Sequence, residues 1–186
     1  VELYNKMGKK EEAVKTLSEA RAKYPKDSEL LRAEVNVYLT EQKYDQALGL
    51  LKDLTAQDPS NEMIWFVLGV TYEKLGKVSD QETAYLKALE INPKYFDALF
   101  NLGATYYNQG VEKYKECDKI PPREAAKYDA CVKDANTIFA KSIGYFETGY
   151  NERPTDKDII NALKEAYVRV GNMEGKKKME DALKGL

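Results

Sequence analysis

Side chains that could carry out chemistry are few in this chain. Its 186 residues include no histidine, which removes the commonest general base and the commonest metal ligand. The two cysteines, Cys117 and Cys131, are far from a CxxC spacing, so the sequence predicts no zinc site. The 31 acidic residues are scattered along helical patterns, and no glycine-rich phosphate loop is present. We therefore expect no catalysis, no metal and no other cofactor.

Charge and hydropathy narrow the class of partner. The chain has 29 basic and 31 acidic residues and a formal net charge of -2. Binding to nucleic acid or to an anionic membrane surface needs a basic excess, which is absent here. No apolar run approaches the roughly 20 residues that a membrane-spanning helix requires. The sequence favours a protein that neither binds nucleic acid nor inserts into a membrane.

A period of 34 residues organises the elements that would position any site. Tyrosine keeps this interval at four positions and proline at three: Tyr4, Tyr38, Tyr72 and Tyr106, with Pro25, Pro59 and Pro93. Within each period, apolar residues at helical spacing occur twice, separated by a short turn, and the proline ends the unit. One such helix pair cannot bury its apolar face alone, so neighbouring pairs must stack. The pattern predicts an all-α fold of antiparallel helix pairs.

The period and its residues resemble the tetratricopeptide-repeat family, whose 34-residue unit has Trp, Leu, Gly, Tyr, Ala, an aromatic residue, Ala and Pro at set positions. Two segments match it closely, WFVLGVTY at 65–72 and LFNLGATY at 99–106. Gln81, where a small residue is usual, and Glu34 and Val35, in place of Leu-Gly, depart from it. The resemblance implies one domain over residues 1–186, a right-handed superhelical solenoid. Its expected units are 1–27 (partial), 28–61, 62–95, 96–156 and a C-terminal cap at 157–186.

The fourth unit is longer than the others. From Tyr106 to Tyr167, the next tyrosine of the same column, is 61 residues, which is 34 plus an insertion of 27. Helical patterning continues through the extra residues and is broken at Ile120-Pro121-Pro122. We therefore predict two lengthened helices that form a hairpin projecting from the solenoid. About 11 extra residues per helix, at about 1.5 Å each, give a projection of roughly 16 Å.

The predicted hairpin register brings the two cysteines to one level. The pairing across the turn of an ordinary unit, carried into the fourth unit, places Tyr106 near Ser142. Eleven residues farther out on each helix, Cys117 lies level with Cys131. A disulfide forms only if the two Cα atoms come within about 7 Å. Two reduced, buried thiols are the alternative, because disulfides persist only in oxidising compartments.

The family resemblance also implies a binding surface. Tetratricopeptide arrays bind peptides or helices along the concave surface, which the first helix of each unit lines. Transferred to this chain, that surface comprises Arg32, Asn36, Met63, Phe66, Val70, Phe100, Tyr107, Asn108 and Arg169. We expect Phe66, Phe100 and Tyr107 to be the hot spots, the alternative being that they pack against neighbouring first helices. Arg32 and Asn36 resemble part of a clamp for C-terminal carboxylates, but Asp97 stands where a cation is needed, so no such clamp is expected.

The sequence therefore predicts a non-catalytic scaffold or adaptor that binds a peptide or helix of another protein in the groove. The alternative is a self-association module, or the C-terminal end of a larger array, because the partial first unit leaves one side of its helix pair open. A homo-oligomer through that open face is expected in this case. A looser similarity, in NLGATYYNQG and YFETGYNERP, is to tetratricopeptide proteins of Bacteroides-like bacteria. It leads us to expect an extracytoplasmic bacterial protein, periplasmic or exported, with the cytoplasm as the alternative.

Overall fold

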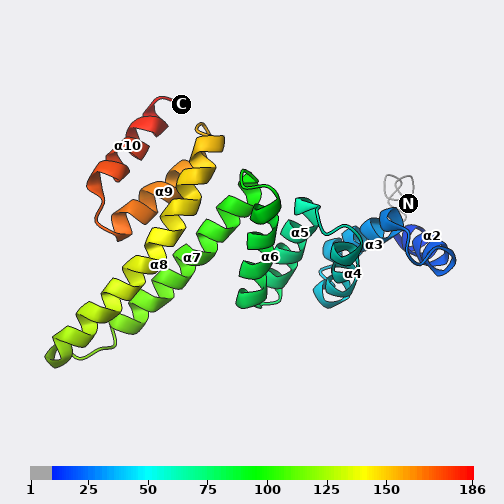
Figure 1. Cartoon of the computed structure of the whole chain (residues 1–186), viewed down its shortest axis with the longest axis horizontal. Helices are drawn as coiled ribbons and strands as arrows, with labels where there is room; N and C mark the ends of the chain where they lie inside the picture. Colours follow the sequence, from blue (N-terminus) through cyan, green and yellow to red (C-terminus); the bar gives the residue numbers. More distant parts are fainter. Residues whose placement is uncertain (1–9) are drawn as a thin grey trace. The chain divides into compact units, whose positions relative to one another are not determined.

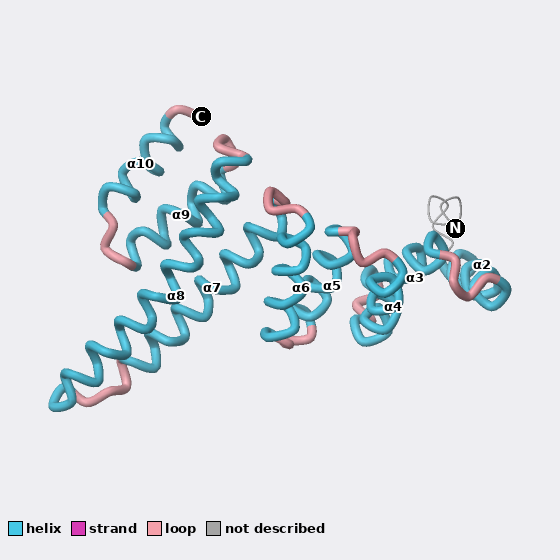
Figure 2. Tube along the Cα trace, in the orientation of Figure 1, coloured by secondary structure: helices cyan, strands magenta, loops and turns pink. Residues whose placement is uncertain are grey.

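Helices joined by short turns make up the computed structural model, which describes residues 10–186 (Figures 1 and 2). No strand occurs in this range, so the predicted all-α class is confirmed. The described chain forms two compact parts, one ending at Ile91 and one comprising Asn92–Leu186. The first helix of the partial first unit, with Tyr4 and Gly8, lies outside the described residues. So does most of the open face on which the self-association expectation depends.

The N-terminal part contains five described helices, each packed against the next. They are α2 (Lys10–Lys23), α3 (Ser28–Thr40), α4 (Tyr44–Gln57), α5 (Glu62–Lys74) and α6 (Val78–Ile91). The apolar faces of α3, α4, α5 and α6 meet in one core that contains Leu31, Leu51, Ile64 and Leu68. Helix pairs α3–α4 and α5–α6 thus occupy the predicted units 28–61 and 62–95.

The C-terminal part contains two long and two shorter α-helices. They are α7 (Phe96–Cys117), α8 (Ala125–Glu152), α9 (Lys157–Arg169) and α10 (Met173–Lys184), with a 3-10 turn at Pro122–Glu124. Helix α7 packs along α8, α9 packs on both, and α10 packs on α9. Helices α3, α5, α7 and α9 begin at residues 28, 62, 96 and 157, which are the first residues of the units expected from the period.

Short polar side chains explain why several of these helices begin where they do. The carboxylate of Asp27 accepts a hydrogen bond from the backbone N–H of Leu30 (3.0 Å). Asp156 caps α9 in the same way, through the N–H of Ile159 (3.1 Å). Asn61 caps α5, and its side chain also contributes to the site described below. Each cap satisfies a backbone donor that has no partner within its helix.

The hairpin of α7 and α8 extends an ordinary helix pair. These helices have 22 and 28 residues, against 13 and 14 in α5 and α6. Near its base, the hydroxyl of Ser142 donates to the backbone oxygen of Gly103 (2.7 Å). At its outer end, Cys117 and Cys131 form a disulfide whose Cα atoms are 5.6 Å apart. Over residues 10–186, no helix is both long and apolar enough to span a membrane.

Candidate protein-binding surfaces

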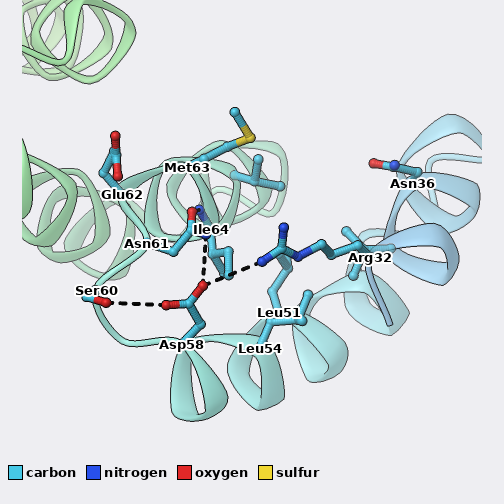
Figure 3. A pocket seen from close by; sticks show the side chains of 12 residues that line it. Arg32, Asn36, Leu51, Leu54, Asp58, Ser60, Asn61, Glu62, Met63 and Ile64 are labelled. Carbon is cyan, nitrogen blue, oxygen red and sulfur yellow. Dashed lines mark hydrogen bonds and ion pairs between the residues drawn. The ribbon is translucent and has the colours of Figure 1, made fainter. Parts of the chain in front are cut away.

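A pocket of about 430 Å³ opens in the N-terminal part, between α3 and the start of α5 (Figure 3). Two turns of α3, the end of α4, the α4–α5 turn and the first turns of α5 contribute side chains to it. The lining residues are Arg32, Val35, Asn36, Leu51, Leu54, Asp58, Ser60, Asn61, Glu62, Met63, Ile64 and Val67. Three residues predicted from the sequence, Arg32, Asn36 and Met63, are therefore brought together here.

The floor of the pocket is apolar because helix packing buries its residues. Val35, Leu51, Leu54 and Ile64 all belong to the core of the N-terminal part. They come from α3, α4 and α5, so the floor depends on three helices at once. A fixed apolar floor of this kind can receive an apolar side chain of a ligand without rearranging.

Polar groups cross one side of the pocket and centre on Asp58. Its carboxylate accepts hydrogen bonds from Asn61 Nδ2 (2.9 Å), Ser60 Oγ (3.4 Å) and Arg32 Nη2 (3.5 Å) (Figure 3). The Arg32 and Asp58 side chains are 40% and 41% exposed, so this long ion pair adds little stability. In the part of the chain that the structure describes, Arg32 Nε is buried and has no hydrogen-bond partner. The guanidinium is thus weakly held and can turn toward an acceptor on a ligand.

The rim opposite Asp58 is open. Asn36 is exposed on α3, and 62% of the surface of Met63 is accessible on α5. An unbranched thioether adapts its shape to different apolar partners. The amide of Asn36 offers both donors and an acceptor. Together they form an edge that can contact a peptide lying over the floor.

The predicted aromatic hot spots are half-buried, and each packs on the second helix of its own pair. Phe66 stacks on Tyr85 with ring centroids 5.8 Å apart. Phe100 is 5.9 Å from Phe146, and Tyr107 meets the ring of Phe139 edge-on at 5.5 Å. Part of each ring therefore stabilises the fold and only the remainder can contact a partner. Phe100 and Tyr107 also pack against the core that α9 contributes to, which agrees with the expected packing between first helices. The role of the three rings as hot spots stays a prediction.

The remaining predicted residues are distributed over both parts. Val70 on α5 is half-buried outside the pocket lining, and Asn108 on α7 is exposed. Arg169, at the end of α9, donates from Nε to the hydroxyl of Tyr107 (3.2 Å). This hydrogen bond is the main reason that the pKa of Arg169 is raised. The structure thus pairs Tyr107 with Arg169 across 62 residues of sequence.

Asp58 and Asn61 are among the pocket residues that were not predicted from the sequence. They belong to the sequence Asp-Pro-Ser-Asn between α4 and α5, where proline was used only to mark the end of a unit. Asp and Asn beside a proline are typical of turns in which side chains bond to nearby groups. The sequence therefore allowed the turn to be predicted. It does not indicate that the turn borders a pocket.

Comparison with known proteins places this chain among repeat proteins. Family models described as tetratricopeptide repeat match residues 2–27 and 32–96, and a model described as TPR repeat matches residues 83–110. Two curated proteins are similar. "TPR repeat-containing protein YpiA" of Bacillus subtilis (strain 168) is 27% identical over 170 residues, 86% of this chain and 40% of that protein. The human "PEX5-related protein" is 25% identical over 121 residues, 64% of this chain and 18% of that protein. The chain spans less than half of either relative.

Solved structures share the fold. The crystal structure of MamA superposes with a TM-score of 0.74 at 16% identity, covering 97% of this chain and 84% of that one. YrrB, described as a TPR protein with an unusual peptide-binding site, gives a TM-score of 0.68 at 16% identity, covering 97% of this chain and 79% of that one. At such identities the likeness concerns the fold alone.

Proposed function

Because this chain belongs to the tetratricopeptide-repeat family, we propose that it is a non-catalytic scaffold that binds another protein through the pocket between α3 and α5. The fold generally mediates protein–protein interaction and is typically non-catalytic. The observation that carries the proposal is a pocket of about 430 Å³ with an apolar floor and a polar side. The peptide-binding site named for YrrB supports it, since that protein has the same fold.

The chemistry of the pocket suits an extended peptide or one face of an amphipathic helix. An apolar side chain of the partner would cover Leu51, Leu54 and Ile64, which removes apolar surface from water. The amides of Asn36 and Asn61 can bond backbone groups of the partner. The weakly held guanidinium of Arg32 can donate to a backbone carbonyl or a carboxylate of the partner.

An affinity pull-down from a lysate of the source organism tests this proposal, with three forms of the protein as bait. The pocket variant is Asn36→Ala/Met63→Ala, which removes two exposed rim side chains and no core contact. The matched control is Met173→Ala, since Met173 on α10 is 61% exposed, almost the same as Met63. A partner held by wild type and by the control, and lost from the pocket variant, is the expected result. Equal retention by all three proteins would exclude the pocket.

A structural role is the second candidate function. The chain matches only 40% and 18% of two longer relatives, which favours a module that stacks on further repeats or on another copy. The molar mass measured by light scattering at increasing protein concentration separates the candidates. A mass that rises with concentration supports self-association, and a constant monomer mass supports an adaptor.

For the location of the protein, we propose an oxidising, extracytoplasmic compartment. The disulfide between Cys117 and Cys131 is the supporting observation, because disulfides persist in such compartments and are rare in the cytosol. Alkylation of thiols in intact cells, followed by mass spectrometry, tests it. No alkylated cysteine is expected before reduction. Two alkylated cysteines per chain would instead support a cytoplasmic protein.

A further inference from the structure

The hairpin of α7 and α8 has an outer part that α9 does not reach. Near the base, α9 covers Phe100, Ala104 and Tyr107 of α7, together with Ile143 and Phe146 of α8. In the orientation drawn, the connected ends of α7 and α8 continue past the end of α9 (Figures 1 and 2). Within the C-terminal part, the helix pair therefore presents a continuation of the face that α9 packs on.

Helical spacing identifies the residues of this continuation. Val111 and Tyr114 follow Tyr107 on α7 after four and seven residues, which keeps them on the same side of the helix. On α8, Val132 and Tyr128 precede Phe139 by seven and eleven residues and likewise keep its side. All four are half-buried. We call Val111, Tyr114, Tyr128 and Val132, with Arg169 at their edge, the outer hairpin face.

Interactions across the outer hairpin face show that its members lie together. Arg169 Nε bonds the hydroxyl of Tyr107, and the phenol of Tyr114 acts electrostatically on the same guanidinium. The side chains of Tyr114 and Tyr128 are hydrogen-bonded, which raises the pKa of Tyr128. A row of aromatic and cationic groups thus runs from the end of α9 across α7 to α8. Tyrosine and arginine are also the residues most enriched at binding hot spots.

We propose that the outer hairpin face binds a helix of a partner protein, lying in line with α9 and carrying acidic side chains beside Arg169. The occupant is a helix because the face continues one that α9 already covers, and a helix fits between two antiparallel helices. Arg169 and the tyrosine hydroxyls offer donors to a carboxylate. Glu165, one turn before Arg169 and also acting on it, repels an acid on the α9 side. Asp118 and Asp129, which act on Tyr128, repel an acid at the outer end of the face, so the acids of the partner lie between these groups, over Tyr114.

The size of the face sets the length of the partner helix. Tyr107 and Tyr114 are seven residues apart, which is about 10 Å along α7. A partner helix of about three turns covers this length together with the end of α9. The proposal does not rest on the pocket between α3 and α5, which belongs to the other part of the chain.

A display library of amphipathic helical peptides of about 14 residues is a direct probe. The library has apolar residues at i, i+3, i+4 and i+7 and varies Asp, Glu and neutral residues between them. It is selected against the full oxidised chain. We expect enriched peptides rich in acidic residues, with Kd values in the micromolar range. Tyr114→Ala/Tyr128→Ala should weaken their binding at least ten-fold. Tyr24→Ala, which removes a tyrosine that is 56% exposed on the other part, should leave binding unchanged.

Two further measurements keep the result independent of folding. Tyr114→Phe/Tyr128→Phe retains both rings and removes the hydroxyls, and it should weaken acidic peptides about three- to ten-fold. Backbone amide NMR shifts caused by a bound peptide should lie in residues 107–132 and 165–169. No enrichment, shifts confined to other residues, or equal binding by the alanine pair would overturn the proposal. So would a concentration-dependent dimer that the alanine pair abolishes, because the occupant would then be a second copy.

Discussion

A Cβ atom at Gly110 would lie 2.8 Å from Cε1 of Phe139, closer than side chains approach one another in proteins. The same relationship joins Gly103 and Phe146, seven residues nearer the base on each helix, where the distance would be 2.6 Å. Seven residues are about two helical turns. The hairpin is therefore an ordinary helix pair whose glycine–aromatic contact is repeated once farther out. The disulfide of Cys117 follows after seven more residues on α7.

This contact makes Gly110 intolerant of a side chain. Phe139 is fully buried, so its ring cannot move aside to admit the methyl group of Gly110→Ala. We expect the variant to lower the free energy of unfolding by about 1–3 kcal/mol, as overpacking does. Gly144→Ala is the matched control, since nothing lies within 4 Å of a Cβ there and alanine favours a helix by up to about 1 kcal/mol. Urea titrations followed by circular dichroism measure the stability of both variants. Equal unfolding midpoints for Gly110→Ala and Gly144→Ala would contradict the packing argument.

Sequence predicted the parts of this molecule that follow from its period. Helix starts at residues 28, 62, 96 and 157 repeat because each unit must present the same apolar face to its neighbour. Cys117 and Cys131 could be placed at one level because both hairpin helices rise equally per residue.

The degree of exposure of the candidate site could not be predicted in the same way. A helical period gives the side of a helix on which Phe66 or Phe100 lies, and does not tell how much of the ring Tyr85 or Phe146 covers. The hydrogen bond from Arg32 to Asp58 could not be predicted either, since it joins α3 to a turn across 26 residues. Such contacts depend on how helices pack, and no local pattern encodes them.

Loss of the disulfide should loosen only the outer hairpin. Cys117 is the only buried residue between 111 and 134, so few other contacts hold this end together. Closing a loop of about 15 residues restricts the unfolded chain by about 3 kcal/mol in the chain-entropy model. We expect Cys117→Ala/Cys131→Ala to speed amide hydrogen exchange in residues 111–131, while exchange in α9 stays unchanged. Wild type treated with a dithiol reductant should show the same pattern. Acceleration throughout the C-terminal part would contradict a local role.

Gln42 adopts a backbone conformation that glycine tolerates better. Its φ is 58°, and at corresponding turns Gly76 and Gly171 have φ values of 68° and 72°. A residue with a Cβ atom costs about 1–2 kcal/mol in the left-handed region, and glycine avoids this cost. Part of the gain is lost because glycine has more conformational freedom to lose on folding. Gln42→Gly should therefore raise the free energy of unfolding by about 0.5–1 kcal/mol. Gly76→Ala should lower it by a similar amount although open space surrounds its Cβ position. Thermal unfolding of the two variants tests this prediction: relative to wild type, the melting temperature should rise for Gln42→Gly and fall for Gly76→Ala. Changes of the same sign in both variants would contradict it.

Alkaline pH should destabilise the N-terminal part through Tyr85. Burial raises the pKa of Tyr85 far above its ordinary value of 10.0. The neighbouring carboxylate of Glu73, which accepts a hydrogen bond from the Tyr85 hydroxyl (3.1 Å), raises this pKa further. The unfolded chain therefore loses this proton at lower pH than the folded chain. The stabilisation is complete below about pH 10 and is lost as pH rises further, by up to about 1.4 kcal/mol per pH unit. Tyr85→Phe removes the titrating hydroxyl, so its urea midpoint should fall less between pH 9 and pH 11 than that of wild type. Tyr24→Phe, at an exposed position, should keep the wild-type slope. If Tyr85→Phe also kept that slope, Tyr85 would not be the group responsible.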